Sequence, residues 1–296
     1  MSKNIKLLLR AAAGLSLALI VIAIGSYIIV AQTTTGTWEA KYRPEKEDKI
    51  HFSFSRETEK NHKNSFGSDF EFKDFQGLTR QDALGSNTKV QFSLVREAGT
   101  INCEGTFQDG RGSGTFTFTP NASFVSAMES RGFKNLSEEK LFASTTLDVT
   151  TSFVDDVLSM GFQDLDYDDI FKARIFKVTP QFAAEMTSIG FPNLNMEDLV
   201  KARIFKIDSA YAREIAGMGF KNDSLEGLVK FRIFKVTPEF LREVQAEGLV
   251  NLSGEDVVKL RIFKIDGAFI RQARTENVPI TVEALVNKRI GVWSRN

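Results

Sequence analysis

Apolar side chains occupy every second position in six short runs that follow residue 35. The runs read GTWEAKY, KIHFSFSR, DFEFKDF, KVQFSLV, TINCEGTF and GTFTFT. A period of two gives a strand one buried face and one wet face. The residues expected on the buried face are Phe52, Phe54, Phe70, Phe72, Phe92, Leu94, Phe116 and Phe118. The pattern predicts a small antiparallel β domain over residues 36–119.

The glycine-rich stretch QDGRGSG joins the last two runs. Its Asp109-Gly110 pair is typical of a hairpin turn. The glycine spacing matches neither a dinucleotide fingerprint nor a P-loop, and a strand follows it instead of a helix. We therefore interpret the stretch as a turn, and nothing in the sequence indicates a cofactor.

Beyond residue 120 one unit of 29 residues recurs six times, up to Ser294. The tetrapeptide RIFK occurs four times at this interval. An aromatic residue steps by the same interval, as Phe124, Phe153, Phe182, Tyr211, Phe240 and Phe269. A glycine does so as Gly132, Gly161, Gly190, Gly219 and Gly248. A fixed period of this length is typical of stacked repeats.

Each unit carries the signals of two short helices. In the third unit Thr179 is a typical N-cap with proline after it, and Gly190 fits the left-handed position that ends a helix. The second helices have predicted N-caps at Ser137, Asp166, Asn195, Ser224, Ser253 and Thr281. One face of the second helix in the third unit is expected to carry Met196, Leu199, Val200, Ile204 and Ile207. A strand remains the alternative for the segment ARIFKVT, which is rich in β-branched and aromatic residues.

The acidic and basic residues of the second helices favour the helical interpretation. Glu197–Lys201, Glu226–Lys230 and Glu255–Lys259 stand four residues apart and are expected to pair within each helix. The first and last units depart from the consensus, as the ends of a stack must. The predicted fold class is therefore α+β and multidomain, with a transmembrane helix, the β domain and an αα-hairpin solenoid of six repeats over residues 120–296.

The N-terminal region predicts an export or anchoring segment. A basic cytoplasmic tail, residues 1–10, precedes an uncharged run over residues 11–31 that is long enough to cross a bilayer as a helix. The cations place the N-terminus in the cytoplasm and the bulk of the chain outside it, in the periplasm or at the cell surface. The alternative is a signal sequence that is cleaved and leaves a secreted protein.

Composition removes several classes of function. Basic and acidic residues number 38 each, which argues against a nucleic-acid binder. One cysteine, Cys103, and two histidines, His51 and His62, give no metal site or catalytic set, and we expect no enzyme. The stretch DLDYDD lacks the glycine and glutamate that a calcium loop requires at later positions, so its aspartates are interpreted as helix caps.

A cationic ridge is the candidate binding site. Its residues recur with the repeat and are Arg174, Arg203, Arg232, Arg261, Lys177, Lys206, Lys235 and Lys264. The ridge could bind an acidic partner. Alternatively, these cations satisfy the carbonyls and the dipole at helix C-termini.

The repeat consensus VTPxFxxxM with RIFK, and the preceding segment REAGTINCEGTFQDGRGSGTFTFTPN, resemble uncharacterised bacterial membrane-anchored proteins. They are also similar to the C-terminal extensions of BlaR/MecR-like antirepressor metallopeptidases, although no peptidase motif is present. The resemblance implies an extracytoplasmic accessory or sensory region. Many such relatives read RIHG where this chain has RIFK, and the lysine argues against a left-handed turn at that position.

These observations predict a non-enzymatic, membrane-anchored protein whose repeats bind another protein, and the resemblance implies an accessory role in signalling. The alternative is a sensor whose β domain binds a small apolar ligand or a cell-wall fragment. Convergent polar groups in a pocket of the β domain would favour the sensor, and a grooved face of the repeats with exposed aromatic residues would favour the scaffold.

Overall fold

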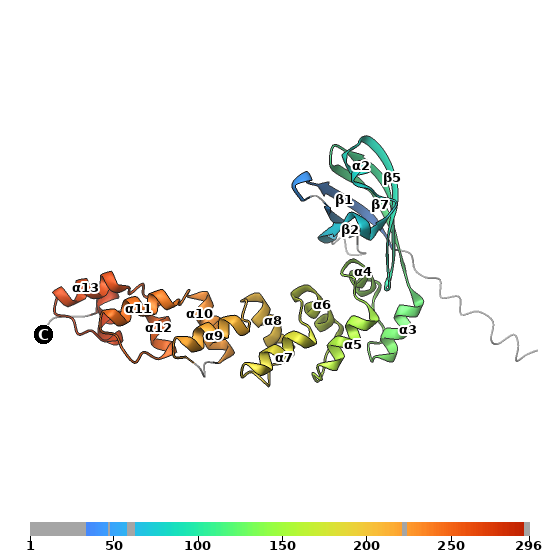
Figure 1. Ribbon diagram of the computed structural model, residues 1–296. Coiled ribbons are helices and arrows are strands. Elements are labelled where there is room, and N and C mark those ends of the chain that lie inside the picture. The colour runs from blue at the N-terminus through green and yellow to red at the C-terminus, as the bar shows by residue number, and fades with distance from the viewer. Residues whose placement is uncertain (1–33, 47, 58–62, 221–223, 293–296) are drawn as a thin grey trace, which may run out of the picture. The chain divides into compact units, whose positions relative to one another are not determined.

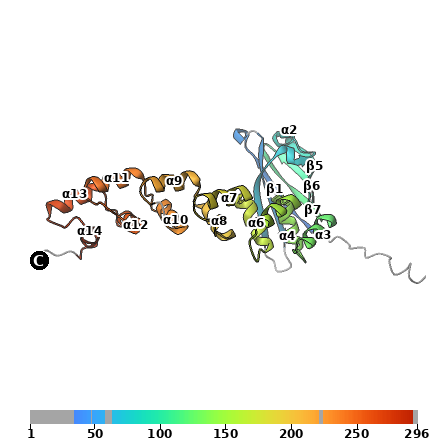
Figure 2. The same cartoon turned by 60° about the horizontal axis from the view of Figure 1, so that its bottom comes forward.

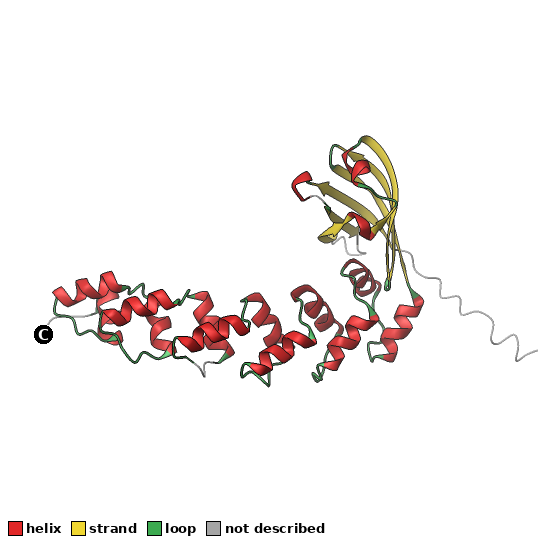
Figure 3. Cartoon of the chain, viewed as in Figure 1, coloured by secondary structure: helices red, strands yellow, loops and turns green. Residues whose placement is uncertain are grey.

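The computed structural model describes residues 34–46, 48–57, 63–220 and 224–292 (Figures 1 and 3). Over these residues the chain is α+β, as predicted, and divides into two compact units. The β unit comprises residues 34–94 and 100–120, and the helical unit comprises residues 95–99 together with the chain from residue 121. The turn at residues 95–99, which the sequence assigned to the β domain, thus groups with the helices.

The predicted tail and anchor, residues 1–10 and 11–31, lie outside the residues that the structure describes. Within the described ranges, no helix combines the length and the apolar character that a membrane crossing requires.

The β unit is a curled antiparallel sheet of seven strands in the order β3-β2-β1-β7-β6-β5-β4 (Figure 1). The strands are β1 (Thr34–Tyr42), β2 (Lys49–Glu57), β3 (Lys63–Glu71), β4 (Phe75–Gln76), β5 (Ser86–Arg96), β6 (Gly99–Gln108) and β7 (Arg111–Pro120). The short elements η1 (Pro44–Lys46), η2 (Phe72–Asp74) and α2 (Arg80–Leu84) lie in the connections. Asp109 and Gly110 both have positive φ, which confirms the predicted hairpin turn between β6 and β7.

Aromatic rings fill the inner face of the sheet. Trp38 is 1% exposed and lies 5.3–5.6 Å from the rings of Phe52, Phe92 and Phe107. Phe75 of β4 is 4.7 Å from Phe52, so residues of the two outer parts of the sheet meet inside the curl. The predicted buried face is confirmed for seven of its eight residues.

Phe72 is the exception, because the third strand ends at Glu71 and Phe72 belongs to η2, where it packs edge-on against Tyr42 at 5.2 Å. The short helix α2 was not predicted from the sequence. Its signal was present: Thr79 caps the helix and forms a capping box with Asp82.

The helical unit contains two helices in each 29-residue repeat (Figure 2). The first helices are α3 (Ala122–Ser130), α5 (Thr151–Ser159), α7 (Pro180–Ser188), α9 (Ser209–Gly217), α11 (Pro238–Ala246) and α13 (Gly267–Thr275). The second helices are α4 (Glu138–Thr146), α6 (Tyr167–Phe176), α8 (Met196–Ile204), α10 (Leu225–Ile233), α12 (Gly254–Ile262) and α14 (Val282–Arg289). Each RIFK segment therefore forms the end of a second helix and the turn that follows it, and the strand alternative is wrong.

The caps confirm the sequence prediction. All six predicted residues cap the second helices, and the side chain of each accepts a hydrogen bond from a backbone amide of the first turn. The aspartates of DLDYDD belong to this scheme: Asp166 is the N-cap of α6 and Asp169 completes its capping box. Gly190 has φ of 105°, as expected for the residue that ends α7.

Helices of the same kind pack side by side along the array. Contacts join α6 with α8, α8 with α10, α10 with α12, and α12 with α14. Helices of eight to ten residues are marginal alone in water, so each repeat gains its stability from its neighbours.

The first-helix aromatics are expected to stabilise the array unequally. Phe182 and Phe240 are 2% and 6% exposed, whereas Phe269 of the last repeat is only half-buried. Phe182→Ala and Phe240→Ala should each lower the free energy of unfolding by about 3–5 kcal/mol, and Phe269→Ala should lower it less. Denaturant unfolding of the full-length chain measures the three changes, and equal losses would contradict a stack of neighbour-dependent repeats.

Candidate functional site

The arginines of the predicted ridge lie over aromatic rings of their own repeats. Arg203 is centred 3.6 Å from the ring of Phe182, and Arg232 is 3.5 Å from the ring of Tyr211. Arg174, Arg261 and Arg289 lie 5.3, 4.7 and 3.8 Å from Phe153, Phe240 and Phe269. Each is a cation–π contact between the second and the first helix of one repeat.

The same arginines reach the preceding repeat. Arg174 Nε donates to the carbonyl of Leu147 at 2.8 Å, and Arg261 Nε donates to the carbonyl of Phe234 at 2.8 Å. Arg232 donates to the carbonyl of Lys206 at 2.8 Å, and Arg289 donates to that of Lys264. The acceptors belong to the first or second residue after the preceding second helix, where carbonyls have no partner in the helix. These four arginines therefore join consecutive repeats.

The four lysines of the ridge are exposed and adopt left-handed backbone conformations. The φ angles of Lys177, Lys206, Lys235 and Lys264 are 56°, 53°, 52° and 50°. The expectation that lysine would prevent this turn is wrong. The residue after each lysine is a buried valine or isoleucine, and its amide bonds back to the helix, as Ile207 does to Ala202 at 2.8 Å. Burial of that residue and its hydrogen bond hold the turn.

Isoleucine of RIFK faces solvent in every repeat that carries it. Ile204, which the sequence placed on the buried face of α8, is 52% exposed, and Ala202 is buried in its stead. The equivalent residues are between 49% and 54% exposed and are Ile175, Ile233, Ile262 and Ile290. We call these five isoleucines, together with Lys177, Lys206, Lys235 and Lys264, the Ile–Lys row.

The ion pairs on the second helices run from one repeat to the next. Lys201 pairs with Glu226 at 3.4 Å, and Lys230 pairs with Glu255 at 2.7 Å. Lys172 pairs with Glu197, and its hydrogen bonds to Glu197 and Asp169 hold the pKa of Lys172 above its usual range. The sequence predicted pairs inside one helix, and it missed these because they depend on how neighbouring helices align.

From α7 onward, the first residue of each first helix either has no backbone N–H or donates it to a glutamate of the preceding repeat. Pro180 and Pro238 remove the donor altogether. Where the helix begins with Ser209 or Gly267, the amide donates to Glu185 or Glu243 of the preceding repeat, each at 3.0 Å. The hydrogen bonds from Ser209 hold the pKa of Glu185 below its usual range.

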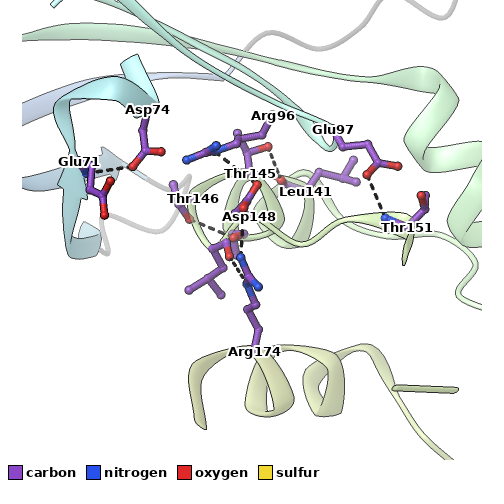
Figure 4. A network of polar contacts seen from close by, with 12 residues as sticks. Glu71, Asp74, Arg96, Glu97, Leu141, Thr145, Thr146, Asp148, Thr151 and Arg174 are labelled. Atoms are coloured by element: carbon purple, nitrogen blue, oxygen red, sulfur yellow. Dashed lines mark hydrogen bonds and ion pairs between the residues drawn. The ribbon is translucent and has the colours of Figure 1, made fainter. Parts of the chain in front are cut away.

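The β5–β6 turn supplies the glutamate that accepts a hydrogen bond from the first amide of α5 (Figure 4). Glu97 accepts from the amide of Thr151 at 3.0 Å, while the first repeat has only Ala127 at the position of Glu185. Arg96 pairs with Asp148 at 3.4 Å, and Asp148 also pairs with Arg174 at 3.1 Å. The turn therefore caps the N-terminal end of the helical unit.

The remaining candidate residues lie in the β unit. Cys103 is buried, and burial raises the pKa of its thiol well above the usual range, in agreement with its interpretation as a small core residue. His51 Nδ1 lies 2.8 Å from a carboxylate oxygen of Asp69. His62 lies outside the described residues.

No family model, curated protein or solved structure matches the chain.

The left-handed lysines generate a stability prediction. A non-glycine residue in this conformation costs about 1–2 kcal/mol, and glycine avoids most of that cost. Lys235→Gly should therefore raise the free energy of unfolding by up to about 1 kcal/mol, after allowing for the greater freedom of glycine in the unfolded chain. Lys235→Ala, which keeps the Cβ atom, is the control. Denaturant unfolding that showed equal losses for both variants would contradict the prediction.

Proposed function

We propose that the chain is a membrane-anchored, extracytoplasmic protein-interaction module that binds its partner along the Ile–Lys row. The observation that carries this proposal is the half-exposed isoleucine that recurs in five repeats. The uncharged run at residues 11–31 supports the anchor and the location.

The recurrence of isoleucine is not a general property of the surface. Another exposed position, on the first helix, carries Gln181, Ala210, Glu239 and Ala268 in successive repeats. The side chain at this exposed position therefore varies from repeat to repeat, whereas the isoleucine of the Ile–Lys row does not. About half of each isoleucine remains in contact with solvent, and we attribute its recurrence to a contact outside the chain.

The lysines support the same conclusion independently. Glycine is the favoured residue for a left-handed turn beyond a helix, and it would be more stable there. Four repeats nevertheless keep lysine. Residues that persist in costly backbone conformations cluster at functional sites, and here the retained group is the ammonium at the end of the side chain.

The composition of the row defines the partner. Neighbouring packed helices lie about 8–10 Å apart, whereas an extended peptide advances about 3.3 Å per residue. One repeat therefore matches about three residues of partner. We infer an extended protein segment that places an apolar side chain at about every third position and carries carboxylates between them.

The test is photocrosslinking of the full-length chain in its native membrane. A photoreactive residue at position 233 should crosslink to one protein, while the same residue at position 239, at an exposed and variable site, should not. Ile204→Ser, Ile233→Ser and Ile262→Ser, introduced together, should reduce crosslinking from position 175 at least about tenfold, since each removes apolar contact area.

The matched control is a triple change at apolar residues off the row. Leu84, Val250 and Val292 are 47%, 64% and 68% exposed, and their replacement by serine should leave the crosslink unchanged. Replacement of the four row lysines by glycine should also weaken the crosslink, and added salt should do so in the wild type. Equal crosslinking by both triple variants would overturn the proposal.

A further inference from the structure

The outer face of the β unit carries a line of directly opposed polar side chains that runs across four strands through Arg111, Lys41, His51 and Asp69. Arg111 of β7 stands directly opposite Lys41 of β1, and Lys41 stands directly opposite His51 of β2. Directly opposed side chains lie about 4.5–5.5 Å apart at their Cβ atoms, and like charges in such pairs are destabilising. Lys41 and Arg111 form such a like-charged pair.

A small cavity lies at the end of this line. Its volume is about 150 Å³, and it is lined by Lys41, Arg43, Lys46, Lys49, His51 and Asp69. Four of these six side chains are permanent cations and one is a carboxylate, which leaves a formal charge of +3 before protonation of His51. The residues come from β1, η1, β2 and β3 and the connection after β1.

Asp69 arranges two of the cavity groups. It accepts from Lys46 Nζ at 2.6 Å and lies 2.8 Å from His51 Nδ1. The hydrogen bond from Lys46, followed by that from His51, holds the pKa of Asp69 below its usual value, so its carboxylate is charged at neutral pH. A fixed carboxylate on the wall positions the imidazole and the ammonium, and it leaves Lys41, Arg43 and Lys49 to face a ligand.

We propose that this cavity binds the phosphoryl group of a small phosphate or of a phosphodiester headgroup. An Arg with several Lys side chains is the donor set that recognises phosphoryl oxygens. The volume is below the range of about 300–1,000 Å³ that is typical of sites for whole organic ligands, so the cavity fits a charged group and leaves the rest of a larger molecule outside. The negative charge of a bound phosphoryl group also offsets the repulsion between Lys41 and Arg111.

Histidine NMR of the full-length chain in detergent micelles tests the site. The chain has only two histidines, so the ring resonances of His51 are assigned by comparison with His51→Gln. Inorganic phosphate and glycerophosphoglycerol are titrated separately, with sodium chloride at matched ionic strength as the blank. We expect a saturable shift of the His51 ring and none of the His62 ring with at least one of the two probes.

Two double variants that remove the same amount of positive charge distinguish binding in the cavity from attraction to the overall positive charge of the unit. Lys41→Gln with Arg43→Gln should weaken binding at least about tenfold, because it removes two charge-assisted hydrogen bonds. Lys73→Gln with Lys89→Gln, which removes two exposed cations of the same unit outside the cavity, should change it less than about twofold.

The outcomes are distinct. Saturation by phosphate alone assigns a free anion, and saturation by glycerophosphoglycerol alone or by both assigns the headgroup. Absence of saturation with both probes, or equal weakening by both double variants, overturns the proposal. These results do not depend on the Ile–Lys row, which lies in the other unit.

Discussion

The helical unit depends on the contacts of the arginine in RIFK, which stacks on an aromatic ring and donates hydrogen bonds to the preceding repeat. We call these contacts the arginine clasp. The guanidinium covers an aromatic ring of its own repeat. In three of the four RIFK repeats, and at the equivalent Arg289, it also donates to a carbonyl just beyond the preceding second helix. Helices of this length do not persist alone, and the open C-terminal carbonyls of one repeat are satisfied only when the next is folded. Folding of each repeat is therefore coupled to that of its neighbour through a single side chain.

The arginine clasp also determines which residues near the ridge are available to bind a partner. Three of the four ridge arginines, Arg174, Arg232 and Arg261, donate to the preceding repeat. The four ridge lysines are exposed, and the isoleucines two positions before them are about half exposed. The buried valine or isoleucine after each lysine anchors the turn, and the four lysines share the same left-handed backbone conformation from repeat to repeat. A regular row of this kind arises from the packing underneath it.

Features encoded within a few residues could be predicted from the sequence, and features set by alignment between segments could not. Thr179 with Pro180, and Asn195 with Asp198, are local caps, and the structure has helices where they indicate them. The exposure of Ile204 depends on how α8 meets its neighbours, and the pairing of Lys201 with Glu226 depends on the offset between two helices. The capping role of Glu97 needs the β5–β6 turn to reach a helix 54 residues away in sequence, which no local pattern contains. The cavity beside His51 likewise requires the register of three strands.

First helices that begin with proline alternate along the array with first helices whose first amide donates to a glutamate. Thr179-Pro180 is followed by Asp208-Ser209, then by Thr237-Pro238 and by Asp266-Gly267. The pattern that recurs in full is therefore a pair of repeats, 58 residues long, in which a proline-type unit supplies the glutamate that its successor needs. The array has the signature of a gene segment duplicated as such a pair. Lengthening it by whole pairs preserves every one of these hydrogen bonds, whereas adding a single unit sets two members of the same type side by side.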